Sequence, residues 1–162
     1  MIILGIDPGL AIVGWGALEF QANHFKVLGY GSIQTPAHTP LEKRLGQIYA
    51  DMNRLLDKYR PDSMAIEELY FNTNITTGIR VAEARGILLL CAEQHGITIS
   101  EYTPQQVKQA VVGYGKAEKM QVIAMVTRLL CLPEPPKPDD TADALAIAIC
   151  HGHASSSRMP IR

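Results

Sequence analysis

The sequence predicts an α/β fold in which a five-stranded mixed sheet carries helices on both faces. Three apolar segments follow one another near the amino terminus with only short turns between them, which is typical of an antiparallel meander. After residue 40, longer segments of helical periodicity alternate with short apolar segments, which favours strands added in parallel. The 162 residues, 47% of them hydrophobic, suffice for one domain with a substantial core.

The elements follow from these patterns in chain order. Strands are predicted at residues 2–7, 12–20 and 25–34, with Asn23-His24 at the tip of the second hairpin. Thr39 and Thr103 each begin a capping box that opens a helix. The other expected elements are strands at 63–67 and 97–102 and helices at 76–95, 117–130 and 139–153. We expect one domain at residues 1–154 and a flexible tail at residues 155–162.

The charge is nearly balanced over the whole chain but uneven along it. A net charge of −1 argues against a globally basic nucleic-acid binder. Residues 103–132 nevertheless carry an excess of lysine and arginine, and residues 133–143 carry an excess of acids. A basic segment beside an acidic one suits a site that holds a polyanion through metal ions, although solvated helix faces would look the same.

Membrane and secretion signals are not found in the sequence. No apolar stretch is long enough to span a bilayer, and the amino terminus lacks the pattern of a signal peptide. The three cysteines are odd in number and widely spaced, which argues against disulfides and a structural zinc site. We therefore expect a cytoplasmic protein with no membrane contact.

Two carboxylates are predicted at the carboxyl ends of strands. Asp7 ends the first apolar segment and is followed by a Pro-Gly turn, and Glu67 ends the strand at 63–67. Strand alternation sends Glu67 and Glu68 to opposite faces, and Glu67 is preferred because it ends its segment as Asp7 does. Ligands of such sheets gather beyond the carboxyl ends of adjacent strands.

The last helix supplies a second pair of acids. Asp140 and Asp143 lie three residues apart and therefore share a helix face, whereas Asp139 is expected to cap the helix. Because the helix is apolar nearly all round, a carboxylate at Asp143 would be costly unless a cation neutralised it. With Asp7 and Glu67 these acids would form a hard-oxygen site suited to Mg²⁺ or Mn²⁺, and two such ions are a known device for phosphodiester hydrolysis.

With these acids in these positions, the chain resembles the RuvC family of Holliday-junction resolvases, which are dimeric endonucleases with the ribonuclease H-like fold. The matching segments are residues 2–9, 65–67, 84–86, 106–109, 111–113, 117–119 and 140–148. The resemblance implies a Mg²⁺-dependent endodeoxyribonuclease that resolves four-way junctions by paired, symmetric nicks during recombination and repair. It also implies a homodimer, a bacterial cytoplasmic location and work with the branch-migration complex RuvA and RuvB.

The resemblance assigns roles to individual residues. The metal-binding catalytic acids would be Asp7, Glu67, Asp140 and Asp143, holding two ions per subunit. Lys108 and Lys119 match basic positions near the scissile phosphates. Tyr70 matches an aromatic that enters the junction, at a position where phenylalanine is familiar in the family, and Phe71 follows it.

Other interpretations remain open from the residues alone. An ATPase of the actin and hexokinase type begins with a similar strand, but it needs a second such unit and 162 residues leave no room for one. An RNA-processing relative of the resolvases would differ in substrate. A junction-binding scaffold without catalysis would keep Lys108 and Lys119 but would have no use for convergent acids.

Overall fold

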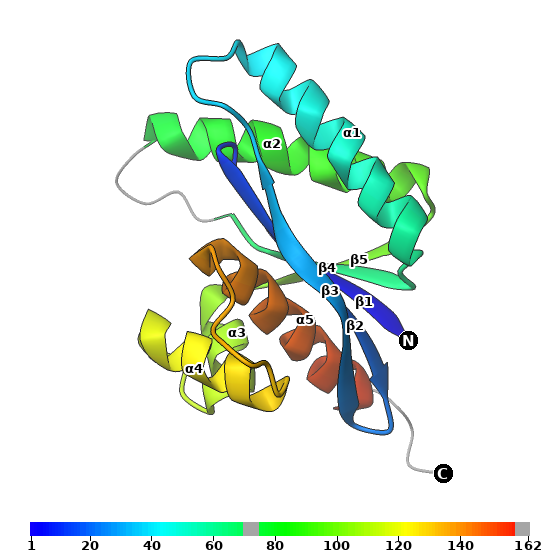
Figure 1. Ribbon diagram of the computed structural model, residues 1–162, viewed down its shortest axis with the longest axis vertical. Coiled ribbons are helices and arrows are strands. Elements are labelled where there is room, and N and C mark those ends of the chain that lie inside the picture. Colours follow the sequence, from blue (N-terminus) through cyan, green and yellow to red (C-terminus); the bar gives the residue numbers. More distant parts are fainter. Residues whose placement is uncertain (70–74, 158–162) are drawn as a thin grey trace.

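A five-stranded mixed sheet forms the centre of the molecule, with its strands in the order β3-β2-β1-β4-β5. The structure is a computed structural model that describes residues 1–69 and 75–157 (Figure 1). The strands are β1 (Ile2–Asp7), β2 (Ile12–Gln21), β3 (His24–Gln34), β4 (Ser63–Glu67) and β5 (Thr98–Tyr102). The pairs β1–β2 and β2–β3 are antiparallel, whereas β1–β4 and β4–β5 are parallel, so the predicted fold class is confirmed.

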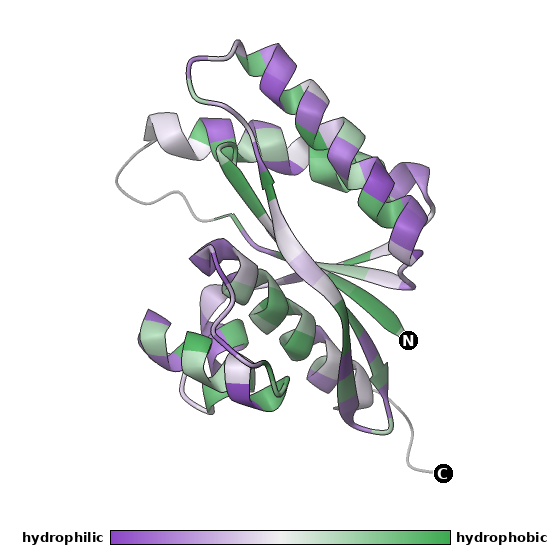
Figure 2. Ribbon diagram, in the orientation of Figure 1, coloured by the Kyte–Doolittle hydropathy of each residue, from purple (hydrophilic) through white to green (hydrophobic). Residues whose placement is uncertain are grey.

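Helices cover both faces of the sheet. They are α1 (Leu41–Tyr59), α2 (Ile75–Gln94), α3 (Pro104–Val112), α4 (Lys119–Leu129) and α5 (Asp139–Ser157). Figure 1 shows α1 and α2 on one face and α3, α4 and α5 on the other. Figure 2 shows that the central part of α5 is hydrophobic nearly all round, while the outward face of α1 is hydrophilic.

The sheet separates two hydrophobic cores because alternate side chains of each strand point to opposite faces. Leu4 and Ile6 of β1 pack with Ile48 and Met52 of α1 in one core. Ile3 packs on the other side, in the core formed with α5. Helix α5 is therefore sandwiched between the sheet and the outer helices α3 and α4, which explains its almost complete burial.

Two turn and cap predictions differ from the structure. The hairpin between β2 and β3 turns at Ala22 and Asn23, both with positive φ, rather than at Asn23-His24. A turn of two left-handed residues matches the twist of the strands it joins, which moves its centre by one residue. The capping box expected at Thr39 is wrong, since Pro40 is the N-cap of α1 and no side chain caps that helix. The box at Thr103 forms with Gln106.

The last helix is longer than predicted. It continues to Ser157, so Ser155 and Ser156 belong to α5 and not to a tail that begins at residue 155. The hydroxyl groups of both serines donate hydrogen bonds to the carbonyl oxygen of Gly152, which satisfies an acceptor near the helix end. Residues 158–162 of the predicted tail lie outside the described residues.

Candidate active site

Asp7 and Glu67 end two neighbouring parallel strands at the same edge of the sheet. The register pairs Ile6 of β1 with Ile66 of β4, so the two acids follow at the same level. Two residues before Asp7, a Cβ atom on Gly5 would overlap Ala144 of α5. Because side chains alternate along a strand, Asp7 also points to the α5 face. Ala65 belongs to the core on that face, so the same holds for Glu67, as predicted for it in preference to Glu68.

A glycine on β2 brings the start of α5 close to Asp7. Gly14 pairs with Asp7 across the β1–β2 ladder, and a Cβ atom on Gly14 would overlap the backbone carbonyl oxygen of Asp140. The first turn of α5 therefore rests directly on the strand beside Asp7. A glycine inside a strand often marks a site where another backbone approaches closely, and at Gly14 the approaching backbone is that of α5.

The four predicted acids act on one another electrostatically. Burial and, after it, the negative charges of Asp143, Glu67 and Asp140 together raise the pKa of Asp7 to about 8, although Lys119 opposes them. Burial and the charge of Asp143 also raise the pKa of Glu67, and Lys108 lowers it. Mutual repulsion of this kind arises only when carboxylates share one site.

Lys119 is the cation that sits among these acids. Its Nζ lies 3.2 Å from Oδ2 of Asp143 and 3.6 Å from Oδ2 of Asp139. Burial raises the pKa of Asp143, and Lys119 opposes that rise. Burial disfavours the charged form of Lys119, but the neighbouring carboxylates outweigh it and raise its pKa. Asp139, expected only to cap α5, thus contributes a charge to the site.

Two cavities flank the acids. One of about 190 Å³ is lined by Glu67, Lys108, Lys119 and Asp143, which brings both predicted lysines to the site. The other, of about 530 Å³, lies on the side of α1 and α2 and is lined by Asp7 and Asp140. Arg44 and Arg80 also line this second cavity. No sequence signal distinguished these two arginines: Arg44 is half-buried and Arg80 is exposed, and neither belongs to a motif that the sequence predicts.

The donor set fits a hard divalent cation. Carboxylate oxygens are the ligands that Mg²⁺ and Mn²⁺ prefer, and a cation would neutralise Asp7, whose pKa is raised by burial and by the charges of three other carboxylates. Within residues 1–69 and 75–157, no three His, Cys, Asp or Glu side chains are grouped closely enough to hold a metal ion as they stand. Metal binding would therefore require the carboxylate groups to move closer to one another, and Lys119 would have to release Asp143 at least in part.

One predicted site residue cannot be placed. Tyr70 and the neighbouring Phe71 lie outside the described residues, so the predicted stacking role of Tyr70 has no structural test here. Glu68, two residues before Tyr70, donates its backbone N–H to the carbonyl oxygen of Tyr102, which continues the pairing of β4 with β5.

The raised pKa of Asp7 predicts how the stability of the metal-free protein depends on pH. The unfolded carboxyl releases its proton near pH 3.8, whereas folded Asp7 keeps its proton up to about pH 8. The stability that this group contributes is therefore complete below pH 3.8 and is lost as the pH rises through about 8. At about pH 9, we expect Asp7→Asn to unfold with a free energy at least about 2 kcal/mol above that of the parent.

Thermal unfolding in EDTA at about pH 5 and about pH 9 measures this effect. The advantage of Asp7→Asn should be small at the lower pH and several degrees in Tm at the higher one. An equal difference at both pH values would contradict the pKa assigned to Asp7.

Comparisons with known proteins identify the family of this chain. The sequence model of a family described as crossover junction endodeoxyribonuclease RuvC matches residues 3–151. A protein of that name from Alkaliphilus oremlandii is 55% identical over 156 residues, covering 96% of this chain and 95% of the relative.

Solved structures extend the comparison to three dimensions. The structure of Thermus thermophilus RuvC matches with a TM-score of 0.88 at 35% identity and covers 97% of each chain. The same protein in complex with a Holliday junction substrate matches with a TM-score of 0.89 at 32% identity, covering 98% of this chain and 97% of that one. The ribonuclease H-like fold expected from the resemblance is confirmed. The chain belongs to the family of crossover junction endodeoxyribonuclease RuvC.

Proposed function

We propose that this chain resolves four-way DNA junctions by metal-dependent, paired nicking of phosphodiester bonds. The observation that carries the proposal is the convergence of Asp7, Glu67, Asp140 and Asp143 at one sheet edge, where their charges act on one another. The Thermus thermophilus relative of the same fold was solved in complex with a Holliday junction substrate, which supports four-way DNA as the substrate.

The acids would hold the metal ions, and the lysines would hold the DNA. Asp7 would be the central ligand, because the charges of Glu67 on β4 and of Asp140 and Asp143 on α5 all raise its pKa. Bound Mg²⁺ or Mn²⁺, with two ions per subunit, would activate water and stabilise the leaving oxygen. Lys108 and Lys119 line the same cavity as Glu67 and Asp143, where their charges would bind phosphate oxygens of the strand. Tyr70 would stack on a base of the opened junction.

A two-fold dimer would place two such sites on symmetric strands. Helix α2 supports this proposal because its outward face is apolar and open: Ile79 is 49% exposed and Leu90 is 46% exposed. Between them, nothing lies within 4 Å of the position that a Cβ atom of Gly86 would take, so another helix has room to approach closely. Within the small-residue stretch 82–86, Ala82 and Gly86 lie one turn apart on this side of the helix, whereas Ala84 between them is buried against the sheet.

The wider setting follows from family resemblance. The branch-migration complex RuvA and RuvB would deliver the junction, and the enzyme would act in the bacterial cytoplasm, where the chromosome lies. Among the helices of the described residues, none has the length and apolar character needed to cross a bilayer.

Cleavage of a synthetic mobile four-way junction in Mg²⁺ tests the proposed function. We expect nicks at symmetric positions on two strands of like polarity, leaving 5′-phosphate and 3′-hydroxyl ends. Removing the metal with EDTA should abolish cleavage, because no other group at the site would activate water, and junction binding should persist.

Three other outcomes would overturn the proposal. Cleavage that continues in EDTA would show that the acids do not work through metal ions. Binding without cleavage in Mg²⁺ or Mn²⁺ would identify a junction-binding scaffold. Faster cleavage of structured RNA than of the DNA junction would identify an RNA-processing enzyme built on the same fold.

A further inference from the structure

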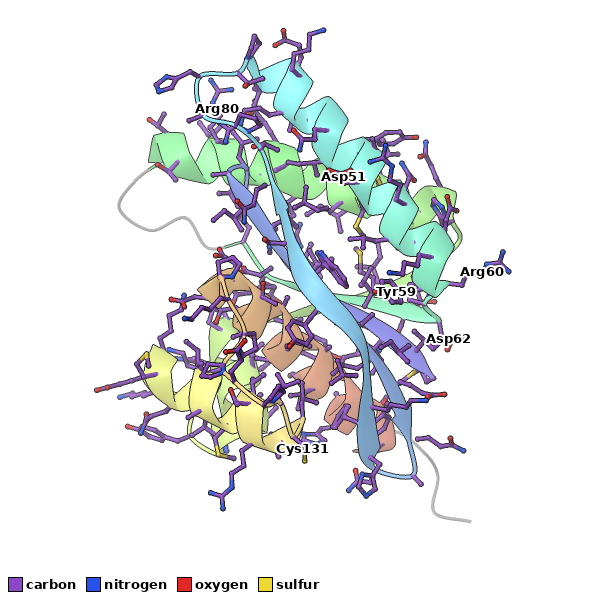
Figure 3. All side chains as sticks on the ribbon, viewed as in Figure 1. Asp51, Tyr59, Arg60, Asp62, Arg80 and Cys131 are labelled. Atoms are coloured by element: carbon purple, nitrogen blue, oxygen red, sulfur yellow. The ribbon has the colours of Figure 1, made fainter. Side chains whose placement is uncertain are left out.

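The cavity on the α1 and α2 side of the acids combines positive and negative walls. Asp7 and Asp140 line it from the sheet and from α5, and Arg44 and Arg80 line it from α1 and α2. Its volume is about 530 Å³, which leaves room for a phosphate group and its sugar. Figure 3 shows Arg80 where α2 approaches the connection between β3 and α1.

Arg44 is held in place by a chain of hydrogen bonds. Its Nε donates to Oγ1 of Thr35 over 2.8 Å, and the hydroxyl of Thr35 donates to the carbonyl oxygen of Leu10 over 2.6 Å. Thr35 is buried, so this anchor is shielded from water. Within the part of the chain that the structure describes, Arg44 forms no ion pair with an acid. Its terminal guanidinium nitrogens are therefore available to a ligand in the cavity.

Arg80 has only a weak partner. Its Nη1 lies 3.2 Å from Oε2 of Glu83, one turn further along α2, and both side chains are largely exposed. Exposed ion pairs of this kind contribute little to stability, so Arg80 can exchange Glu83 for a stronger anion at small cost. The planar fork of a guanidinium matches two oxygens of a phosphate, which an arginine binds better than a lysine does.

The positions of these arginines relative to the acids define what they would bind. Lys108 and Lys119 lie in the cavity on one side of the carboxylates, and Arg44 and Arg80 lie in the cavity on the other side. A DNA strand that crosses the acids therefore meets positive charge before and after the bond to be cut. The carboxylates repel the phosphates of the DNA backbone. Basic side chains on both sides of the acids would offset this repulsion for the phosphates that no metal ion contacts.

We propose that Arg44 and Arg80 form a binding site for a backbone phosphate of the cleaved DNA strand, next to the scissile phosphate and on the side opposite Lys108 and Lys119. This inference rests on the proposed function, since it takes the strand across the four acids as given. Arg44 is the fixed member of the pair because Thr35 orients it. Arg80 is the mobile member, recruited from Glu83 when DNA binds.

Salt dependence of junction binding tests the site in the uncut complex. Affinity is measured by fluorescence anisotropy of a labelled four-way junction in EDTA, over about 50–300 mM salt. Arg44→Gln should weaken binding about tenfold and lower the slope of log K against log salt by about 0.9, the value for one lost phosphate contact. Arg54→Gln is the matched control, because Arg54 stands on the same helix, is 78% exposed and pairs with Asp51.

Neutral phosphate analogues locate the contact. A methylphosphonate is placed at one position after another along the cleaved strand, and the parent and Arg44→Gln are compared on each junction. At one phosphate next to the scissile one, we expect the parent to lose affinity and Arg44→Gln to lose none. If Arg44→Gln responds like the parent at every position, or its salt slope equals that of Arg54→Gln, the inference is wrong.

Two further measurements separate this inference from other failures. Arg80 lies on an exposed face of α2, so the variant Arg80→Gln should fold normally. If its slope of log K against log salt equals that of the parent, Arg80 does not bind the phosphate, and this result holds even if Arg44→Gln unfolds. Binding is measured in the absence of cleavage, so the two proposals can fail separately. If the parent nicks junctions but neither arginine substitution changes junction binding, only the proposed phosphate site is contradicted. A chain that shows the phosphate contact but never nicks in Mg²⁺ contradicts only the proposed function.

Discussion

Replacing Asp7 by asparagine is expected to lower the rate of junction cleavage by at least about 10³-fold, because about 4 kcal/mol of transition-state stabilisation would go with a central metal ligand. The substitution keeps the shape of the side chain and removes its charge. Asp7 pairs with Gly14 of β2, at the point where α5 rests on the sheet, so no other acid of the described residues stands at its position. Single-turnover cleavage of a four-way junction at saturating enzyme measures the effect.

The binding of the junction separates loss of catalysis from loss of folding. We expect the Kd of Asp7→Asn in EDTA to stay within about threefold of the parent, since phosphate contacts come from basic residues. Asp51→Asn is the control: Asp51 lies on α1 and pairs with Arg54, so its loss should leave cleavage unchanged. Cleavage by Asp7→Asn within about tenfold of the parent would show that Asp7 is not a metal ligand.

Adding a methyl group at Gly14 is expected to damage both the fold and the site. Its Cβ would overlap the backbone carbonyl oxygen of Asp140, so α5 must move away from β2. Because α5 is packed on all sides, we expect Gly14→Ala to lose about 3 kcal/mol of unfolding free energy. Asp140 and Asp143 move with the helix, and a shift of about 1 Å in catalytic groups lowers cleavage about 10²-fold.

Gly46→Ala provides the matched glycine substitution. Gly46 lies within α1, and nothing stands within 4 Å of the position of its Cβ atom. Alanine in a helix is favoured over glycine by about 0.5–1 kcal/mol, so this variant should gain stability and cleave normally. Equal Tm values and equal cleavage rates for Gly14→Ala and the parent would mean that the close contact with α5 does not position the acids.

Local patterns were sufficient for the elements that matter most to the site. The strands at 2–7 and 63–67 begin and end where the sequence predicts, because each is a short apolar run bounded by turn residues. Alternation along the strand also selected Glu67 over Glu68, and the structure places Glu67 on the α5 face. Errors were confined to ends and caps. Thr39 does not cap α1, and α5 continues past residue 154, since local signals at helix ends compete with packing.

The charged surroundings of the acids depended on contacts between distant segments. Lys119 stands at the start of α4 and meets Asp139 and Asp143 only because α4 packs on α5. Arg44 reaches the cavity beside Asp7 because Thr35, directly after β3, holds its guanidinium group and is itself held by Leu10, which lies 25 residues before Thr35. Spacing along the chain carries no information on such neighbours, whose distances are set by how the helices pack.

The order of the residues alone predicts the mixed sheet, the strand-end positions of Asp7 and Glu67, the shared helix face of Asp140 and Asp143, and a family resemblance that the comparisons confirm. Periodicity and chain order suffice for these features because each follows from local geometry. Three features of the site emerge only in the folded protein: Gly14 allows α5 to lie beside Asp7, Lys119 pairs with Asp143, and two arginines line the cavity on the other side of the acids. Those features depend on close contacts and on burial, which is the largest cause of the raised pKa of Asp7, and burial exists only once the chain has packed.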